Sequence, residues 1–449
     1  MSEPRPATDE GLVRGIGLAG LTAAVVNSTV GAGIFVLPAA VALRIGAAAP
    51  LAYLLCFVLM ALVVACFALA GSRVSRSGGT YGYVGRAFGP GAGFLAGVLY
   101  WLSDVLANSG VLSALAASAG VLVPRLGSGL GRPALILLVS GGLAGVNVRG
   151  VRAGIGLVQA LTLAKLLPLL LLVAAGLLAV SPANLAWPGL PKAAALGDTV
   201  LLLVFAFVGV EVALGPSGEV KDPARTVPRA VFLALATTTL LYCALQLVSQ
   251  GILGAELARF TDAPLAEAAG RLLGRAGSAL LVLGASVSML GYLSGSMLGS
   301  PRTLFAFGRD GLLPRAFARL HPRFRTPCVA VLTHAAVAST LAISGSFERL
   351  AVMSNVAVLT LYLLCALACW QLVRRDVREE GPPLRVPGER LLPFLACGAI
   401  LWVLSSATGR ELAVTGVVAA TAGLVYALRR ARAARALTPG PPPARPRPG

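Results

Sequence analysis

Twelve long apolar stretches dominate this sequence and restrict what the chain can fold into. Most of them are about as long as the roughly 20 apolar residues that an α-helix needs to cross a bilayer. Only 12% of the residues are charged, against about 25% in a soluble domain. The pattern predicts an all-α integral membrane protein with about 12 transmembrane helices. The stretches are residues 15–43, 48–71, 91–121, 132–149, 150–179, 197–218, 228–253, 276–305, 327–344, 348–373, 390–408 and 411–429.

The placement of the basic residues predicts how these helices are oriented. The formal net charge is +19, from 37 Lys and Arg against 18 Asp and Glu. With the N-terminus in the cytoplasm, 27 basic residues lie in cytoplasmic segments, 9 lie outside, and one, Lys165, lies within a span. Cytoplasmic loops of membrane proteins are enriched in Lys and Arg, so both termini are predicted to be cytoplasmic. The same charge favours contact with anionic lipid, and no nucleic-acid partner is expected.

Few side chains offer catalytic or metal-binding chemistry. The two histidines are His321 and His334, and the seven cysteines show no metal-ligand spacing. No nucleophile and base recur at helical spacing, so we expect neither an enzyme nor a cofactor or metal site. A channel or a carrier-derived sensor is an alternative class of protein, but it requires a continuous polar pore or an added signalling domain.

Two of the apolar stretches are interrupted by glycine and proline. In the first stretch, Gly31 and Gly33 precede Pro38, and in the sixth stretch Gly209 precedes Gly215 and Pro216. Each glycine lowers helix propensity by about 1 kcal/mol, and backbone groups freed in hydrocarbon need polar partners. Interrupted helices in corresponding positions of two halves indicate the binding site of a carrier. The alternative is that the glycines only allow helices to pack closely.

Four sequence blocks resemble the amino acid/polyamine/organocation superfamily of permeases. The glycine motif of its first helix is similar to residues 31–35, with Ala32 at the middle position. The other blocks resemble the loop after its second helix, its sixth helix with the exit loop, and the loop after its eighth helix. In this chain they are residues 77–89, residues 205–211 with 219–230, and residues 309–327.

The resemblance implies a leucine-transporter-type fold with a 5+5 inverted repeat and discontinuous helices 1 and 6. It divides the chain into a cytoplasmic N-terminal segment (1–14), a first five-helix repeat (15–179), a second inverted repeat (197–373), two peripheral helices (390–429) and a disordered, basic, Pro-rich cytoplasmic tail (430–449).

The resemblance also implies secondary active transport of amino acids across the cytoplasmic (inner) membrane by alternating access. The expected mechanism is proton-coupled symport, and the alternative is a sodium-independent exchanger of amino acids or polyamines. The expected partners are a small amino acid or amine, protons and the lipid bilayer. The sequence leaves the particular substrate and the oligomeric state open.

Broken helices offer a partner for each charged group of an amino acid. Free N–H groups at a half-helix N-terminus suit the carboxylate, and free carbonyls at a half-helix C-terminus suit the ammonium. The resemblance places these groups at the two breaks, and Ala32 lacks the hydroxyl that relatives carry. Phe205 matches an aromatic that covers the substrate and acts as a gate, unless it is an ordinary core residue. The expected substrate-binding residues at the breaks are Ser28, Thr29, Val30, Gly31, Ala32, Gly33 and Ile34, then Phe205, Ala206, Phe207 and Val208.

Three further polar residues within the spans are functional candidates. A charge at the bilayer centre costs at least about 2.5 kcal/mol, and Lys165 matches a fifth-helix lysine that replaces a bound sodium ion in relatives. We expect Lys165 to be the coupling cation, with a fixed, non-titrating lysine as the alternative. Glu211 is expected to act in gating. Asp104 and Asn108 share one helix face and are expected to line the pocket for the substrate side chain, or to pair with another protein group.

Overall fold

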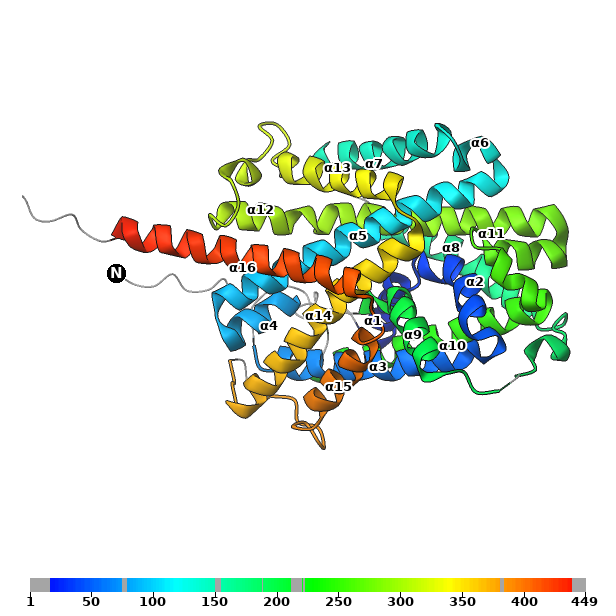
Figure 1. Cartoon of the computed structure of the whole chain (residues 1–449), viewed down its shortest axis with the longest axis horizontal. Helices are drawn as coiled ribbons and strands as arrows, with labels where there is room; N and C mark the ends of the chain where they lie inside the picture. The colour runs from blue at the N-terminus through cyan, green and yellow to red at the C-terminus, as the bar shows by residue number, and fades with distance from the viewer. Residues whose placement is uncertain are drawn as a thin grey trace, which may run out of the picture.

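The computed structural model describes residues 17–74, 79–149, 155–187, 189–210, 220, 223–379 and 383–437. These residues form an all-helical protein without a β-strand (Figure 1). The expected gating residue Glu211 and the N-terminal segment 1–14 lie outside the described residues.

Sixteen α-helices follow one another along the described residues. Those of the first half are α1 (Leu18–Thr29), α2 (Gly33–Ile45), α3 (Ala49–Gly71), α4 (Gly79–Phe88), α5 (Pro90–Leu122), α6 (Pro124–Gly127), α7 (Gly131–Arg149) and α8 (Ile155–Gly176). Those of the second half are α9 (Ala193–Phe207), α10 (Pro223–Leu253), α11 (Pro264–Gly299), α12 (Pro301–Arg309), α13 (Cys328–Ser344), α14 (Phe347–Arg374), α15 (Leu392–Leu404) and α16 (Gly409–Leu437). Short 3₁₀ turns include η1 (Gly46–Ala48), η2 (Pro182–Leu185), η5 (Gly254–Arg259) and η6 (Arg315–Ala318).

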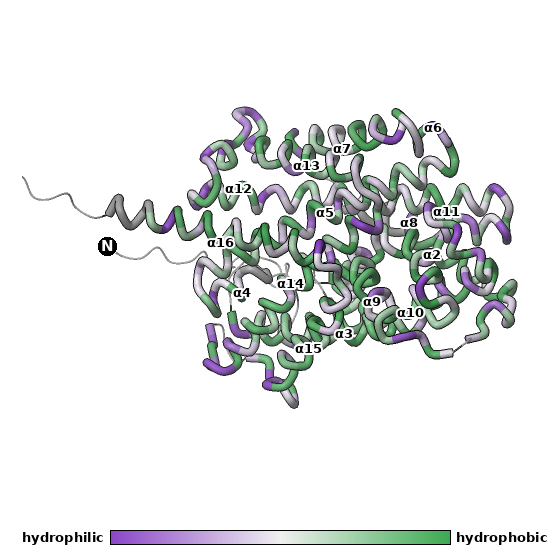
Figure 2. The backbone as a smooth tube through the Cα atoms, viewed as in Figure 1, coloured by the Kyte–Doolittle hydropathy of each residue, from purple (hydrophilic) through white to green (hydrophobic). Residues whose placement is uncertain are grey.

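Seven helical stretches of the described residues are long and apolar enough to cross a membrane, and five shorter apolar helices accompany them. Figure 2 shows that hydrophobic residues follow the helices, while hydrophilic residues gather in connections such as those after α12 and α14. This distribution confirms the prediction of an all-α protein with membrane-spanning helices.

The helices α5 and α14 cross in the middle of the molecule (Figure 1). The Ser354 hydroxyl donates to the Ser103 carbonyl at 2.7 Å. A Cβ on Gly110 would lie 3.5 Å from the ring of Phe347, an ordinary contact distance, so α14 packs directly against this part of α5. Small residues and hydroxyls commonly join helices in this way inside membranes.

The structure differs from the expected helix boundaries at three places. α11 begins at Pro264 and is kinked at Gly274, which has φ +64°, whereas the apolar stretch begins at residue 276 because charged residues precede it. α4 is an additional helix in the loop after the second stretch. α16 continues to Leu437, so residues 430–437 are helical rather than disordered. That segment is rich in Ala and Arg, which are good helix formers, and residues 438–449 lie outside the described residues.

Candidate functional site

The first helix is broken at the glycine motif, as the sequence predicted. α1 ends at Thr29, and Val30 leaves the helical conformation with φ −72° and ψ 81°. α2 begins at Gly33, and no side chain caps its first turn. The break therefore places carbonyls at the end of α1 beside N–H groups at the start of α2. Val30, Ala32 and Ile34 are buried here.

The end of α9, which we call the second break, directly contacts the first. The predicted continuation of this sixth helix falls on residues 211–219, which lie outside the described residues. α9 ends at Phe207, and Val208 turns to extended backbone with ψ 139°. A Cβ on Gly33 would lie 2.9 Å from the Cα of Ala206, and a Cβ on Gly209 would lie 3.0 Å from the Ser28 carbonyl oxygen. Both glycines are therefore needed for the close approach, and Gly209 also has φ +112°, which side chains disfavour.

Lys165 lies against the carbonyl end of α1. Its Nζ donates to the carbonyl of Asn27 and, at 2.8 Å, to the carbonyl of Val30. The side chain is 9% exposed, and the hydroxyl of Ser288 on α11 lies 3.5 Å from the same Val30 carbonyl. A cation at a helix C-terminus interacts favourably with the helix dipole. The ammonium thus fixes α8 to the first break.

Tyr242 on α10 joins the two breaks and was not predicted from the sequence. Its hydroxyl lies 3.0 Å from the carbonyl oxygen of Thr29 and 3.0 Å from that of Ala206. The same helix face carries Gln246, which donates to the Pro38 carbonyl. Tyr242, Gln246 and Gln250 are spaced four residues apart in an apolar helix, and this spacing is the sequence pattern that could have predicted a polar face. It indicated a polar face, but not which carbonyls that face would meet.

Replacing Tyr242 with phenylalanine is expected to slow transport and lower thermal stability. The ring contact with Phe207, at 5.4 Å between centroids, would remain, while the two carbonyls would lose the one hydroxyl proton that they share. A buried acceptor without a partner costs about 1 to 3 kcal/mol. Uptake into proteoliposomes and thermal unfolding would measure the effect. Tyr426→Phe, on the peripheral helix α16, is the matched control, and wild-type behaviour of Tyr242→Phe would contradict the assigned role.

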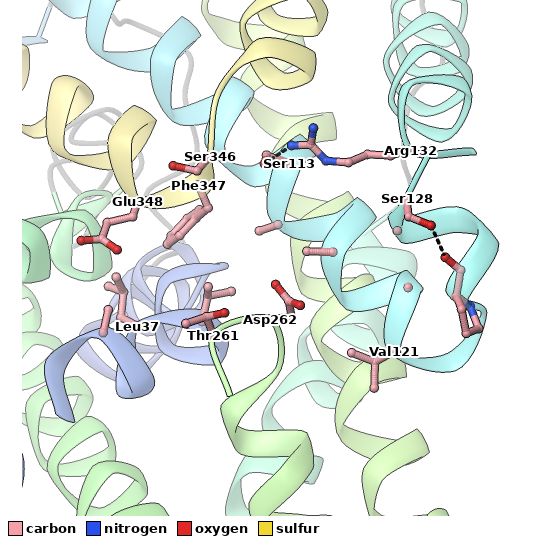
Figure 3. A pocket seen from close by; sticks show the side chains of 17 residues that line it. Leu37, Ser113, Val121, Ser128, Arg132, Thr261, Asp262, Ser346, Phe347 and Glu348 are labelled. Atoms are coloured by element: carbon pink, nitrogen blue, oxygen red, sulfur yellow. Dashed lines mark hydrogen bonds between the residues drawn. The ribbon is translucent and has the colours of Figure 1, made fainter. Parts of the chain in front are cut away.

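A cavity of about 730 Å³ lies between the first half of α2, the last turns of α5 and the start of α14 (Figure 3). Figure 3 shows α2, α5, the start of α14 and the segment before α11 around it. Phe347 lines the cavity, and its ring meets that of Phe205 edge to face, with 5.2 Å between centroids. Phe205 lies two residues before the end of α9, so the cavity wall reaches the second break. Small-molecule sites are typically about 300 to 1,000 Å³.

Arginines fix the helices around this cavity. Arg132 on α7 donates to the hydroxyl of Ser113 at 2.8 Å and to the carbonyl of Gly345 at 3.1 Å, which caps the end of α13. Arg44 on α2 forms an ion pair with Glu348 on α14. Arg132 thus joins α7 to α5 and to the end of α13. Arg44 joins α14 to α2, the helix that follows the first break.

Asp104 and Asn108 lie on α5. Their hydrogen bonds join them to one another and to α11 and α13. The amide nitrogen of Asn108 is 2.8 Å from the Ser296 hydroxyl and 2.7 Å from Nε2 of His334. Their predicted contact with the substrate side chain stays a prediction. The structure brings together the residues of the two breaks and Lys165, and it adds Tyr242 and Phe347 to them.

The apolar helices define a multi-pass membrane protein, and comparison with known proteins gives its family. A family model described as amino acid permease matches residues 16–427. The chain belongs to this family of amino acid permeases, which is part of the superfamily that the four sequence blocks indicated.

Relatives of known or assigned activity cover most of the chain. It is 29% identical to the serine/threonine exchanger SteT of Bacillus subtilis, over 89% of this chain and 92% of the relative. It is 28% identical to a methylthioribose transporter of the same bacterium, over 93% of each. It is 24% identical to the branched-chain amino acid permease BcaP, over 86% of this chain and 87% of the relative. The family, the serine/threonine exchanger and the branched-chain amino acid permease, which is also from Bacillus subtilis, support transport of amino acids.

Proposed function

We propose that this chain is a secondary active transporter that carries amino acids across the cytoplasmic membrane by alternating access. The observation that carries the proposal is the contact between the broken first helix and the end of α9, with the Lys165 ammonium on the carbonyls of Asn27 and Val30. The uncapped start of α2 supplies N–H groups for a substrate carboxylate, and the end of α9 supplies carbonyls for an ammonium. The substrate-binding residues are those expected at the breaks, and Phe205 covers them.

The proposed arrangement comprises twelve spans in two inverted repeats, 15–179 and 197–373, with both termini in the cytoplasm. In this orientation the cavity beside Phe347 faces outward. An amino acid entering it meets the Phe205 and Phe347 rings before it reaches the breaks. The Arg44 and Glu348 side chains must separate for α2 to move away from α14.

Proton-coupled symport is the proposed mechanism, with Lys165 as the coupling cation. Lys165 is buried, and its ammonium is held by the carbonyl oxygens of Asn27 and Val30. Loss of the proton would weaken the hydrogen bonds to the α1 carbonyls and release α8 from the first break. Proton transfer at Lys165 would thereby change the relative position of two helices.

Sodium-independent exchange is the second candidate mechanism. The two carbonyls bound to Lys165 also suit a permanently charged lysine that never titrates, and one relative is named a serine/threonine exchanger. In that case Lys165 is a structural cation, and the substrate on the opposite side drives the return step.

Uptake into proteoliposomes tests both mechanisms. The panel contains radiolabelled serine, threonine, leucine, arginine, putrescine and methylthioribose, with and without an inside-alkaline pH gradient. Accumulation driven by the gradient into empty vesicles is the expected result for symport. Uptake only into vesicles preloaded with substrate would replace symport by exchange, and no transport of any amino acid would contradict the substrate class.

A further inference from the structure

A second polar cluster lies inside the helix bundle, where α5, α11 and α13 meet. It contains Asp104, Asn108, Ser296, Ser300 and His334. The hydroxyls of Ser296 and Ser300 both donate to Oδ2 of Asp104. The amide nitrogen of Asn108 lies 3.3 Å from the same carboxylate oxygen. Asn108 and His334 are 0% exposed, whereas Asp104 is half-buried.

The hydrogen-bond donors around His334 define its protonation state in this arrangement. The Asn108 amide nitrogen lies 2.7 Å from Nε2 of His334, and an amide nitrogen only donates. Nε2 must therefore accept, which makes His334 neutral with its proton on Nδ1. Neither Nδ1 of His334 nor Oδ1 of Asn108 has a hydrogen-bond partner among the described residues. Unpartnered buried polar atoms are costly, and Oδ1 of Asn108 would gain a partner from a rearrangement.

Rotation of the Asn108 side-chain amide is such a rearrangement. A half-turn of the Asn108 amide exchanges its oxygen and nitrogen. Oδ1 then faces Nε2 of His334 and accepts a hydrogen bond if Nε2 carries a proton. Ser296, 2.8 Å from the amide nitrogen, can turn its hydroxyl toward Oδ1 at the same time. The cluster therefore has two hydrogen-bonded arrangements, and in the second Nε2 carries a proton, which comes either from Nδ1 of the same ring or from water.

Asp104 is the charged group that faces His334 across this cluster. It is the one charged residue of α5, and α11 contributes the Ser296 and Ser300 hydroxyls. The edge of Trp101 on α5 covers the imidazole, with ring centroids 6.4 Å apart. The charged side chains of the elements packed against α13 are paired with other groups or exposed: Arg132, Arg149, Glu267, Arg271, Arg275, Arg302, Arg309, Arg315, Glu348, Arg349 and Arg374.

We propose that His334 and Asp104 form a proton-binding site, separate from the two helix breaks. The side-chain amide of Asn108 accepts a hydrogen bond from the protonated histidine. A proton from water binds Nε2 of His334, the Asn108 amide turns to present Oδ1, and the Asp104 carboxylate compensates the imidazolium charge. Titratable groups within membrane spans are usually functional, and histidine titrates in the physiological range. The site does not require Lys165 to release a proton.

The presence of only two histidines makes the proposal directly measurable. The full-length protein is labelled with [15N]histidine, reconstituted in lipid bilayers and studied by solid-state NMR between pH 4.5 and pH 9. His321 lies in the loop before α13, and His321→Gln assigns the two sets of signals. We expect His334 to be neutral and protonated on Nδ1 at alkaline pH, and doubly protonated at acid pH.

Substitution of the carboxylate tests the pairing. In Asp104→Asn, the His334 titration midpoint is expected to move to lower pH by about one unit or more, because an opposite charge has been removed. His321 should not respond. A His334 that stays neutral throughout, or titrates identically in Asp104→Asn, would overturn the proposal.

Transport gives a second readout. His334→Gln should change the pH dependence of uptake, whereas His321→Gln should leave it as in the wild type. Identical pH profiles of the three proteins would contradict a role in transport. The NMR measurement needs no substrate, so the proton site can be tested even if the proposed transport function fails.

Discussion

Lys165→Ala is expected to reduce gradient-driven amino acid uptake to the level of protein-free vesicles. The substitution removes the ammonium that lies on the Asn27 and Val30 carbonyls. Each carbonyl left without a donor costs about 1 to 3 kcal/mol, which loosens α8 from the first break. The proposed coupling proton loses its carrier at the same time. Uptake with an inside-alkaline gradient and substrate binding in detergent are measured on the same preparations.

The chain offers a close control for this experiment. Lys192 precedes α9 and is exposed, so Lys192→Ala removes the same charge outside the helix bundle and should transport normally. Retained binding without uptake in Lys165→Ala would support the coupling role. Exchange that is independent of the gradient and survives the mutation would rule out coupling through Lys165 and favour the exchanger.

Gly33→Ala should have the second large effect, a loss of transport of at least tenfold. Its new Cβ would lie 2.9 Å from the Cα of Ala206 and 3.0 Å from its Cβ. Neither of these atoms belongs to a flexible side chain, so the two breaks must move apart. Insertion of a methyl group into a packed core costs about 1 to 3 kcal/mol. Initial uptake rates and the unfolding temperature of the purified variant measure the change.

Gly31→Ala is the matched control, because it adds the same methyl group two residues earlier. The nearest atom to its Cβ is the Thr29 carbonyl oxygen at 3.9 Å, an ordinary contact distance. We expect Gly31→Ala to keep the contact with α9 and to unfold at a temperature close to that of the wild type, so the comparison with Gly33→Ala is made on stability. Equal damage from both substitutions would indicate that helix propensity, rather than the contact with Ala206, accounts for the glycine at position 33.

The helical class, the first break and the membrane-spanning character could be predicted because local sequence determines them. Gly31 and Gly33 lower helix propensity whatever the neighbouring helices are. The length and hydrophobicity of a span can likewise be read from the sequence without knowing its contacts. The position of Lys165 followed from a similar argument, since a lone charge in a span must find polar atoms. Its particular partners came from the structure.

Contacts between distant segments could not be predicted in the same way. Tyr242 reaches Thr29 and Ala206 because α10 crosses the end of both broken helices, and no local pattern encodes that crossing. The same holds for Phe347 against Phe205 and for Arg44 with Glu348. The extension of α16 to Leu437 was missed for another reason. Its arginines indicate a polar tail, although Ala and Arg also favour a continued helix.

The contact between the two breaks has a consequence for how such a chain can diverge. The groups that it presents, the carbonyls ending α1 and α9 and the N–H groups starting α2, belong to the main chain. Apart from proline, which lacks the N–H, no substitution deletes them, so point mutations can alter the neighbouring rings of Phe205 and Phe347 while the main-chain groups persist. On the proposed function, recognition of the ammonium and carboxylate would be inherited separately from selection of the side chain. One scaffold could then acquire a new cargo through few substitutions.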